Sequence, residues 1–234
     1  MLIVFSHFSH EDDAVVERKT LKSLPGGERV TLHVQHAKTA ALNPIPKDLR
    51  AKADAVIHFY ANTNIDGSPD EYINARAVMR SGVGFDNLDI KAWGARGVPV
   101  FNVPDYGTSE VADHAIALML SLTRGTATYN EAIRTSPAEN WRPGKAPVVR
   151  RLRDLTFGVV GLGRIGLAAA LRARGFGMQI AFYDPLLPSG MEIAVGARRC
   201  KSLVELMATS DVVSVHAPSS EATRGLVNAE ALAA

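Results

Sequence analysis

The sequence predicts an α/β fold made of two doubly wound parallel-sheet domains. Two observations predict it. In the first hundred residues, short apolar runs alternate with polar, helix-like segments. Further along, a short apolar strand passes through a glycine-rich turn directly into a helical run, and a second strand follows. Because consecutive parallel strands need a crossover between them, usually a helix, this alternation indicates parallel sheets with helices on their faces.

Four apolar runs in the first part of the chain are typical of buried strands. They are Leu2–Phe5, Val30–Val34, Ala55–Phe59 and Ala77–Arg80. Between the first two, residues 14–24 form a helical pattern that Pro25, Gly26 and Gly27 bring to an end. We therefore expect a first domain over residues 1–101 and a second over residues 102–234.

The second domain opens with the clearest helical pattern in the sequence, over residues 111–122. Its apolar residues are spaced as one helix face: Val111, Ala115, Leu118, Met119 and Leu122. Thr108 or Ser109 is expected to cap its start, and Gly125 to end it. Residues 134–153, which contain Pro137, Pro143 and Pro147, are predicted to form a solvated basic loop.

A glycine fingerprint, GLGRIG, occupies residues 161–166, directly after the apolar strand 157–160. The GxGxxG spacing is weak evidence alone, but here a strand precedes it, a helical run follows it, and a second strand covers residues 179–183. Gly161 permits the tight turn, Gly163 lets the backbone approach a pyrophosphate, and Gly166 lets the helix pack close to the strand. The pattern predicts a Rossmann dinucleotide-binding domain, with the pyrophosphate at the start of the helix near Arg164.

Two polar residues follow strands of this domain. Asp184 comes 18 residues after Gly166, where an acidic residue accepts hydrogen bonds from the adenosine ribose hydroxyls. Its charge would repel a 2′-phosphate, and residues 185–188 contain no arginine to bind one, so the sequence predicts NAD rather than NADP. His216 follows the strand 211–215 and is expected on the cofactor side, in a structural or cofactor-adjacent role.

Composition excludes several classes of protein. With 26 Lys and Arg against 24 Asp and Glu, the net charge of +2 gives no sign of nucleic-acid or membrane binding. Cys200 is the single cysteine and is expected to be buried and inert, which fits a reducing, cytoplasmic compartment. The N-terminal apolar run is too short for a signal peptide. His7, His10, His33 and His36 lack a framing motif, so no metal site is expected.

Three stretches together resemble the D-isomer-specific 2-hydroxyacid dehydrogenases, in particular bacterial members similar to the C-terminal binding protein. They are residues 80–89 (RSGVGFDNLD), residues 97–104 (GVPVFNVP) and the glycine fingerprint 161–166. Residues 105–114 (DYGTSEVADH) strengthen the likeness to that branch. The resemblance implies a flavodoxin-like substrate domain followed by a Rossmann NAD-binding domain. It also implies an NAD cofactor, a small 2-hydroxy or 2-keto acid as substrate, and a homodimer when the protein is complete.

The resemblance also implies residue roles. Backbone amides at Val83 and Gly84 would hold the substrate carboxylate, since glycine lets an anion approach the backbone. Beside the fingerprint glycines, positions that line the dinucleotide in relatives match Val83, Thr108, Arg164, Ile165, Asp184, His216, Ala217 and Thr223. Residues 60–68 are a candidate lining of the substrate pocket, but no pattern in them identifies the acid.

The family's catalytic arginine, acidic residue and histidine follow the strand that ends at His216. In this chain the last histidine is His216 and the last arginine is Arg224, so the triad has no counterpart here. We therefore expect a C-terminally truncated chain that is inactive by itself. Two hypotheses remain: a complete protein that reduces 2-keto acids with NADH, or a non-catalytic, corepressor-like NAD-binding scaffold.

Overall fold

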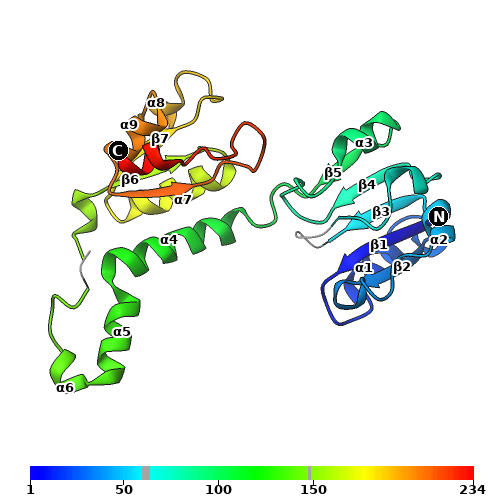
Figure 1. Ribbon diagram of the computed structural model, residues 1–234, viewed down its shortest axis with the longest axis horizontal. Helices are drawn as coiled ribbons and strands as arrows, with labels where there is room; N and C mark the ends of the chain where they lie inside the picture. Colours follow the sequence, from blue (N-terminus) through cyan, green and yellow to red (C-terminus); the bar gives the residue numbers. More distant parts are fainter. Residues whose placement is uncertain (60–63, 147–148) are drawn as a thin grey trace. The chain divides into compact units, whose positions relative to one another are not determined.

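The computed structural model describes residues 1–59, 64–146 and 149–234. The chain divides into two compact units, Met1–Tyr106 and Gly107–Ala234, and each contains a parallel sheet with helices packed on it (Figure 1). The predicted α/β class with two doubly wound parallel sheets is confirmed. Residues 60–63 of the candidate pocket lining, and Pro147 of the predicted loop, lie outside the described residues.

Unit 1 is a five-stranded sheet with the order β2-β1-β3-β4-β5, in which every neighbouring pair is parallel. Its strands are β1 (Leu2–Phe8), β2 (Thr31–His36), β3 (Ala55–His58), β4 (Ala77–Arg80) and β5 (Val100–Asn102). Its helices are α1 (Val15–Ser23), α2 (Lys47–Lys52) and α3 (Ile90–Ala95). This strand order is that of flavodoxin-like folds. Strand β5 has only three residues, too few to show a period in the sequence.

Both faces of the unit 1 sheet are covered, which explains why its strands are continuous apolar runs. Val4, Val56 and Val78 belong to one buried cluster, on one face. Ile3 and Phe5 flank Val4 in β1 and belong to a second cluster. Successive side chains of a strand point to opposite faces, so both sets must be apolar when helices pack on both sides.

Unit 2 is a four-stranded parallel sheet with the order β8-β7-β6-β9. Its strands are β6 (Thr156–Val160), β7 (Gln179–Tyr183), β8 (Arg198–Arg199) and β9 (Val212–Val215). Its helices are α4 (Thr108–Arg124), α5 (Thr126–Thr135), α6 (Pro137–Asn140), α7 (Arg164–Gly175), α8 (Met191–Val195), α9 (Leu203–Ala208) and α10 (Ala229–Ala233). Counted in chain order the sheet runs 3-2-1-4, the arrangement around the first strand of a Rossmann domain.

Helix α4 starts differently from the prediction. It begins at Thr108 with Gly107 as its N-cap residue, and no side chain caps it. The predicted cap by Thr108 or Ser109 is wrong, because both residues already lie inside the helix, whereas a capping residue stands just outside it. The predicted end is confirmed, since Gly125 adopts a left-handed conformation with φ of 63°.

The apolar side chains of α4 divide into two sets rather than one predicted face. Ile116 and Met119 are buried together with Ala169 and Ala173 of α7, whose small side chains let the two helices approach. Val111, Leu118 and Leu122 are exposed. The buried stripe shares Met119 with the predicted face but otherwise lies beside it. Contact with α7, which the sequence does not reveal, decides which side of the helix is covered.

The predicted loop 134–153 is wrong in part. Helix α5 reaches Thr135, and Pro137 begins the short helix α6. Proline fits the first position of a helix because its missing N–H would have no partner there. Pro137 therefore starts a helical turn here and does not break one.

Candidate functional site

The carboxyl ends of β6, β7 and β9 meet at one edge of the unit 2 sheet. Gly161, Asp184 and His216 are the residues that follow these three strands. The Gly161 amide donates to the carbonyl of Tyr183 at 2.9 Å, and the His216 amide donates to the carbonyl of Val160 at 2.8 Å. Three of the predicted cofactor residues therefore come together where ligands bind in doubly wound sheets.

Each fingerprint glycine has a distinct environment. Gly161 has φ of +85°, and a Cβ built on it would lie 3.0 Å from the Ala217 amide nitrogen. A Cβ on Gly166 would lie 2.1 Å from the carbonyl oxygen of Gly161, while one on Gly163 would meet nothing within 4 Å. Gly161 and Gly166 are thus required by close protein packing. Gly163 leaves open space, which suits a residue whose task is to admit a ligand.

Helix α7 presents its first turn to this open space. Its N-cap residue is Gly163, which has no side chain to cap the first amides, and the described residues provide no side-chain cap hydrogen bond there. Such amides, together with the helix dipole, favour an anion. Arg164 is exposed at the first helical position and Ile165 is half-buried beside it. The arrangement suits a pyrophosphate.

Asp184 connects the glycine turn to the loop after β7. Its Oδ2 accepts a hydrogen bond from the Leu162 amide at 2.9 Å, and its Oδ1 accepts one from the Leu186 amide at 3.0 Å. A carboxylate has about four acceptor positions, so capacity remains for hydroxyl groups of a ligand.

Next to the loop after β7 lies an arginine that the sequence pattern did not reveal. Arg199 of β8 donates to the carbonyl oxygens of Asp184, Leu187 and Pro188, at 3.3, 3.2 and 2.6 Å. Residues 185–188 contain no arginine, but the pairing of Phe182 with Arg199 across β7 and β8 brings one close to them. Only that strand register reveals it.

His216 and Thr223 are held by local hydrogen bonds. The Nε2 atom of His216 lies 2.9 Å from the Ser214 hydroxyl, and burial lowers the pKa of His216. Burial thus favours the neutral form of this imidazole. The Thr223 hydroxyl donates to the carbonyl of Pro218 at 2.5 Å and accepts from the Ser220 amide at 3.0 Å. It closes the turn 218–223, which follows Ala217 in the segment after β9.

The predicted carboxylate site lies in unit 1, after β4. Gly84 is exposed, and within the part of the chain that the structure describes neither its amide nor that of Val83 donates to a protein acceptor. Asn102 holds the loop through a 2.8 Å hydrogen bond to the Val83 carbonyl. Arg80, only 7% exposed, donates to the Ser81 carbonyl at 2.7 Å and places a positive charge beside the loop. Of the predicted cofactor contacts Val83 belongs to unit 1 and the others, from Thr108 onward, to unit 2.

Other predicted features also have a defined place. Cys200 is buried as expected, and burial raises the pKa of its thiol, which makes it unreactive near neutral pH. Among the described residues no cluster of three or more His, Cys, Asp or Glu side chains could hold a metal ion. No helix in the described ranges is long and apolar enough to span a bilayer.

Comparison with known proteins identifies the second half of the chain. Residues 116–234 match the family model described as D-isomer specific 2-hydroxyacid dehydrogenase, NAD binding domain. This match covers the glycine fingerprint, Asp184 and His216, and thus the edge of the sheet where they meet. The cofactor of this domain is NAD, as the sequence predicted.

Two curated proteins extend the likeness. C-terminal-binding protein 1 of Caenorhabditis elegans is 37% identical over 161 residues, which are 67% of this chain and 22% of that protein. D-3-phosphoglycerate dehydrogenase of Mycobacterium leprae is 38% identical over 158 residues, which are 68% of this chain and 29% of that protein. The chain thus spans less than a third of either relative.

A solved structure is similar over nearly the whole chain. It is the NADPH-dependent glyoxylate/hydroxypyruvate reductase of Sinorhizobium meliloti in complex with NADP and malonate, at 29% identity and a TM-score of 0.76. The likeness covers 98% of this chain and 66% of that one. Both units of the fold are therefore matched.

Proposed function

The chain belongs to the D-isomer-specific 2-hydroxyacid dehydrogenase family, and from that premise we propose that the complete protein is an NAD-dependent oxidoreductase. It would interconvert a D-2-hydroxy acid and its 2-keto acid, with the bound nicotinamide supplying or accepting hydride. The observation that carries the proposal is the meeting of the fingerprint glycines, Asp184 and His216 at one sheet edge. We also propose a cytoplasmic location, because the single cysteine, Cys200, is buried and forms no disulfide.

This chain's own residues would bind and orient the reactants. The first turn of α7 would hold the pyrophosphate, and Asp184 would accept hydrogen bonds from the ribose hydroxyls. The amides of Val83 and Gly84, with the Arg80 charge nearby, would hold the substrate carboxylate. We assign the residues of this chain binding and orientation only, and no proton transfer.

The likeness to C-terminal-binding protein 1 supports a second candidate, a non-catalytic NAD-binding scaffold. One assay distinguishes the enzyme from the non-catalytic scaffold. The complete protein is mixed with NADH and pyruvate, glyoxylate or hydroxypyruvate, and NADH consumption is followed. Turnover supports the enzyme. Tight NADH binding without turnover of any 2-keto acid supports the scaffold, and failure to bind NADH contradicts both.

Asp184 provides a direct test of the cofactor assignment. We expect Asp184→Ala to weaken NADH binding about ten- to a hundredfold, because a hydrogen bond to a charged group contributes about 1.5–3 kcal/mol. NADPH binding should stay constant or improve, since the charge that repels the 2′-phosphate is gone. Fluorescence titration of both cofactors into the complete protein measures this, with Asp184→Asn as the variant that loses only the charge. Wild-type protein that binds NADPH as tightly as NADH would contradict the preference for NAD.

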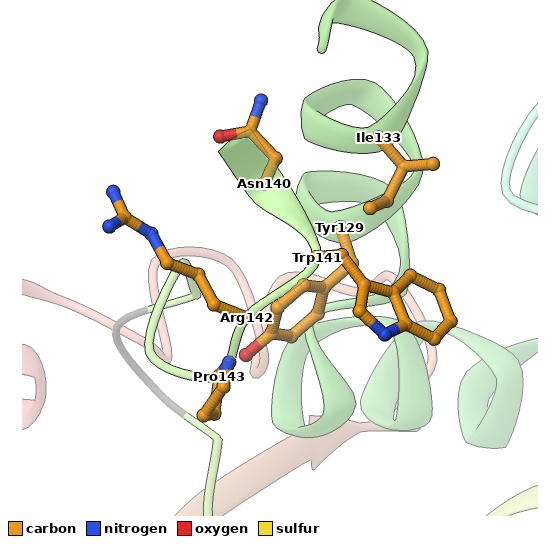
Figure 2. Close-up of a pocket in the computed structure, with 6 residues that line it drawn as sticks. All are labelled: Tyr129, Ile133, Asn140, Trp141, Arg142 and Pro143. Carbon is orange, nitrogen blue, oxygen red and sulfur yellow. The ribbon is translucent and has the colours of Figure 1, made fainter. Parts of the chain in front are cut away.

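We further propose that the complete protein is a homodimer that covers the exposed stripe of α4. Leu118 and Leu122, 54% and 64% exposed, are spaced along one side of the helix with Val111. Next to the end of α4, helix α5 and the segment after α6 form an apolar pocket of about 400 Å³. Figure 2 shows Trp141 beside Tyr129 at this pocket, and Trp141 is 85% exposed. Exposed apolar area of this kind marks an interaction surface.

The dimer is tested by analytical ultracentrifugation of the complete protein. We expect a dimer for the wild type and a monomer for the double variant Leu118→Glu and Leu122→Glu, because a buried, unpaired carboxylate opposes association. Leu42→Glu, at an exposed leucine of unit 1, is the control and should remain dimeric. A wild-type monomer at high concentration would remove the proposal.

A further inference from the structure

Arg199 makes an unusual set of bonds for a residue on a two-residue edge strand. Besides the carbonyls of Asp184, Leu187 and Pro188, it contacts Glu192 through a 2.9 Å hydrogen bond from Nε to Oε2. Its guanidinium carbon also lies 5.0 Å from the centre of the Phe182 ring. One planar side chain thus joins β7, the loop after it and helix α8.

Glu192 completes the attachment at the other end of the loop. Its Oε1 accepts a hydrogen bond from the Gly190 amide at 3.2 Å, while its Oε2 accepts from Arg199. Arg199 and Glu192 together therefore hold the loop 184–190 along its length. The bonded groups are the carbonyls of Asp184, Leu187 and Pro188 and the amide of Gly190. The planar fork of arginine can bind several acceptors at once, which the ammonium of lysine cannot do.

The loop held in this way is the one that carries Asp184. The Asp184 carboxylate bonds the Leu162 amide of the glycine turn and the Leu186 amide of the loop. A shift of the loop would therefore move the carboxylate relative to the glycine turn. A site that is already in its binding conformation loses less freedom when the ligand arrives.

We propose that Arg199 is a positioning residue, which holds the loop 184–190 and the Asp184 carboxylate in the shape that receives the adenosine half of NAD. The inference rests on the proposed function, because it takes Asp184 as the ribose-binding residue. It also gives Arg199 a role other than phosphate binding. Its guanidinium is bound to three carbonyls and a carboxylate, so it is not a free cation for a 2′-phosphate.

The test uses the complete protein with three ligands: NADH, ADP-ribose for the adenosine half, and reduced nicotinamide mononucleotide for the other half. We expect Arg199→Met to weaken NADH and ADP-ribose about tenfold or more through lost preorganisation, with the mononucleotide within about twofold of wild type. Arg199→Lys should lose affinity to an intermediate degree. The control is Arg198→Met at the neighbouring arginine, which contacts Glu205 and Thr209 instead and should leave all three affinities unchanged.

The results of these titrations distinguish a failure of the positioning role of Arg199 from a failure of the proposed function. Wild-type protein that fails to bind NADH overturns the proposed function and this inference with it. Wild-type binding together with normal ADP-ribose affinity in folded Arg199→Met overturns the inference alone. Equal weakening of all three ligands overturns it too, because it indicates a general structural role. If Arg199→Met does not fold, the same ligand comparison in Arg199→Lys decides.

Discussion

Gly163→Val is expected to weaken NADH binding by about a hundredfold or more while changing the melting temperature by only a few degrees. A side chain at this position meets no protein atom within 4 Å, and its backbone, with φ of −74°, is allowed for any residue. The same side chain would fill the space through which, in the proposed site, a pyrophosphate would reach the first amides of α7. Loss of two hydrogen bonds to a charged group costs about 3–6 kcal/mol, which corresponds to this loss of affinity.

Calorimetric titration of NADH and a thermal melt of the complete protein measure the two effects separately. Gly175→Val serves as the control, since Gly175 ends α7 and also has no neighbour within 4 Å. It should bind NADH as the wild type does. Undiminished affinity in Gly163→Val would place the pyrophosphate elsewhere and would contradict the proposed cofactor site.

Gly161→Val, in contrast to Gly163→Val, is expected to lower the stability of unit 2. The φ of +85° at Gly161 is strained for a β-branched residue, and the added Cβ would lie 3.0 Å from the Ala217 amide nitrogen and 3.1 Å from the His216 carbonyl carbon. Backbone strain and overpacking each cost about 1–3 kcal/mol, so a total of about 4 kcal/mol is expected. For a unit of this size that lowers the melting temperature by roughly 15 °C.

Urea denaturation of the complete protein, followed by a probe in unit 2, gives the change in the free energy of unfolding. Gly163→Val, two residues away, is the matched comparison, because the same side chain enters open space there. A loss of stability below about 1 kcal/mol for Gly161→Val would show that the 216–217 backbone can move aside. The close approach of β9 to the glycine turn would then not be a fixed part of the site.

The sequence pattern predicted the bounds of a helix or strand correctly where the interactions that set those bounds lie within a few residues along the chain. The strand Ala77–Arg80, the start of α7 at Arg164 and the strand Gln179–Tyr183 have the predicted bounds. Gly125 ends α4 as expected because a left-handed residue is a local requirement. Strands β5 and β8, with three and two residues, could not be predicted, since a period cannot be read from so short a run.

The sequence was sufficient to predict the α/β class, the glycine turn between β6 and α7, and three sets of residues that follow strands as candidate cofactor contacts: the fingerprint glycines, Asp184 and His216. These depend on spacing along the chain, which fixes which residues follow each strand. The packed structure was needed to establish which stripe of α4 is buried and that Arg199 lies behind the Asp184 loop. Each of these follows from the packing or pairing of segments distant in sequence, such as Phe182 with Arg199, and no local pattern encodes the partner.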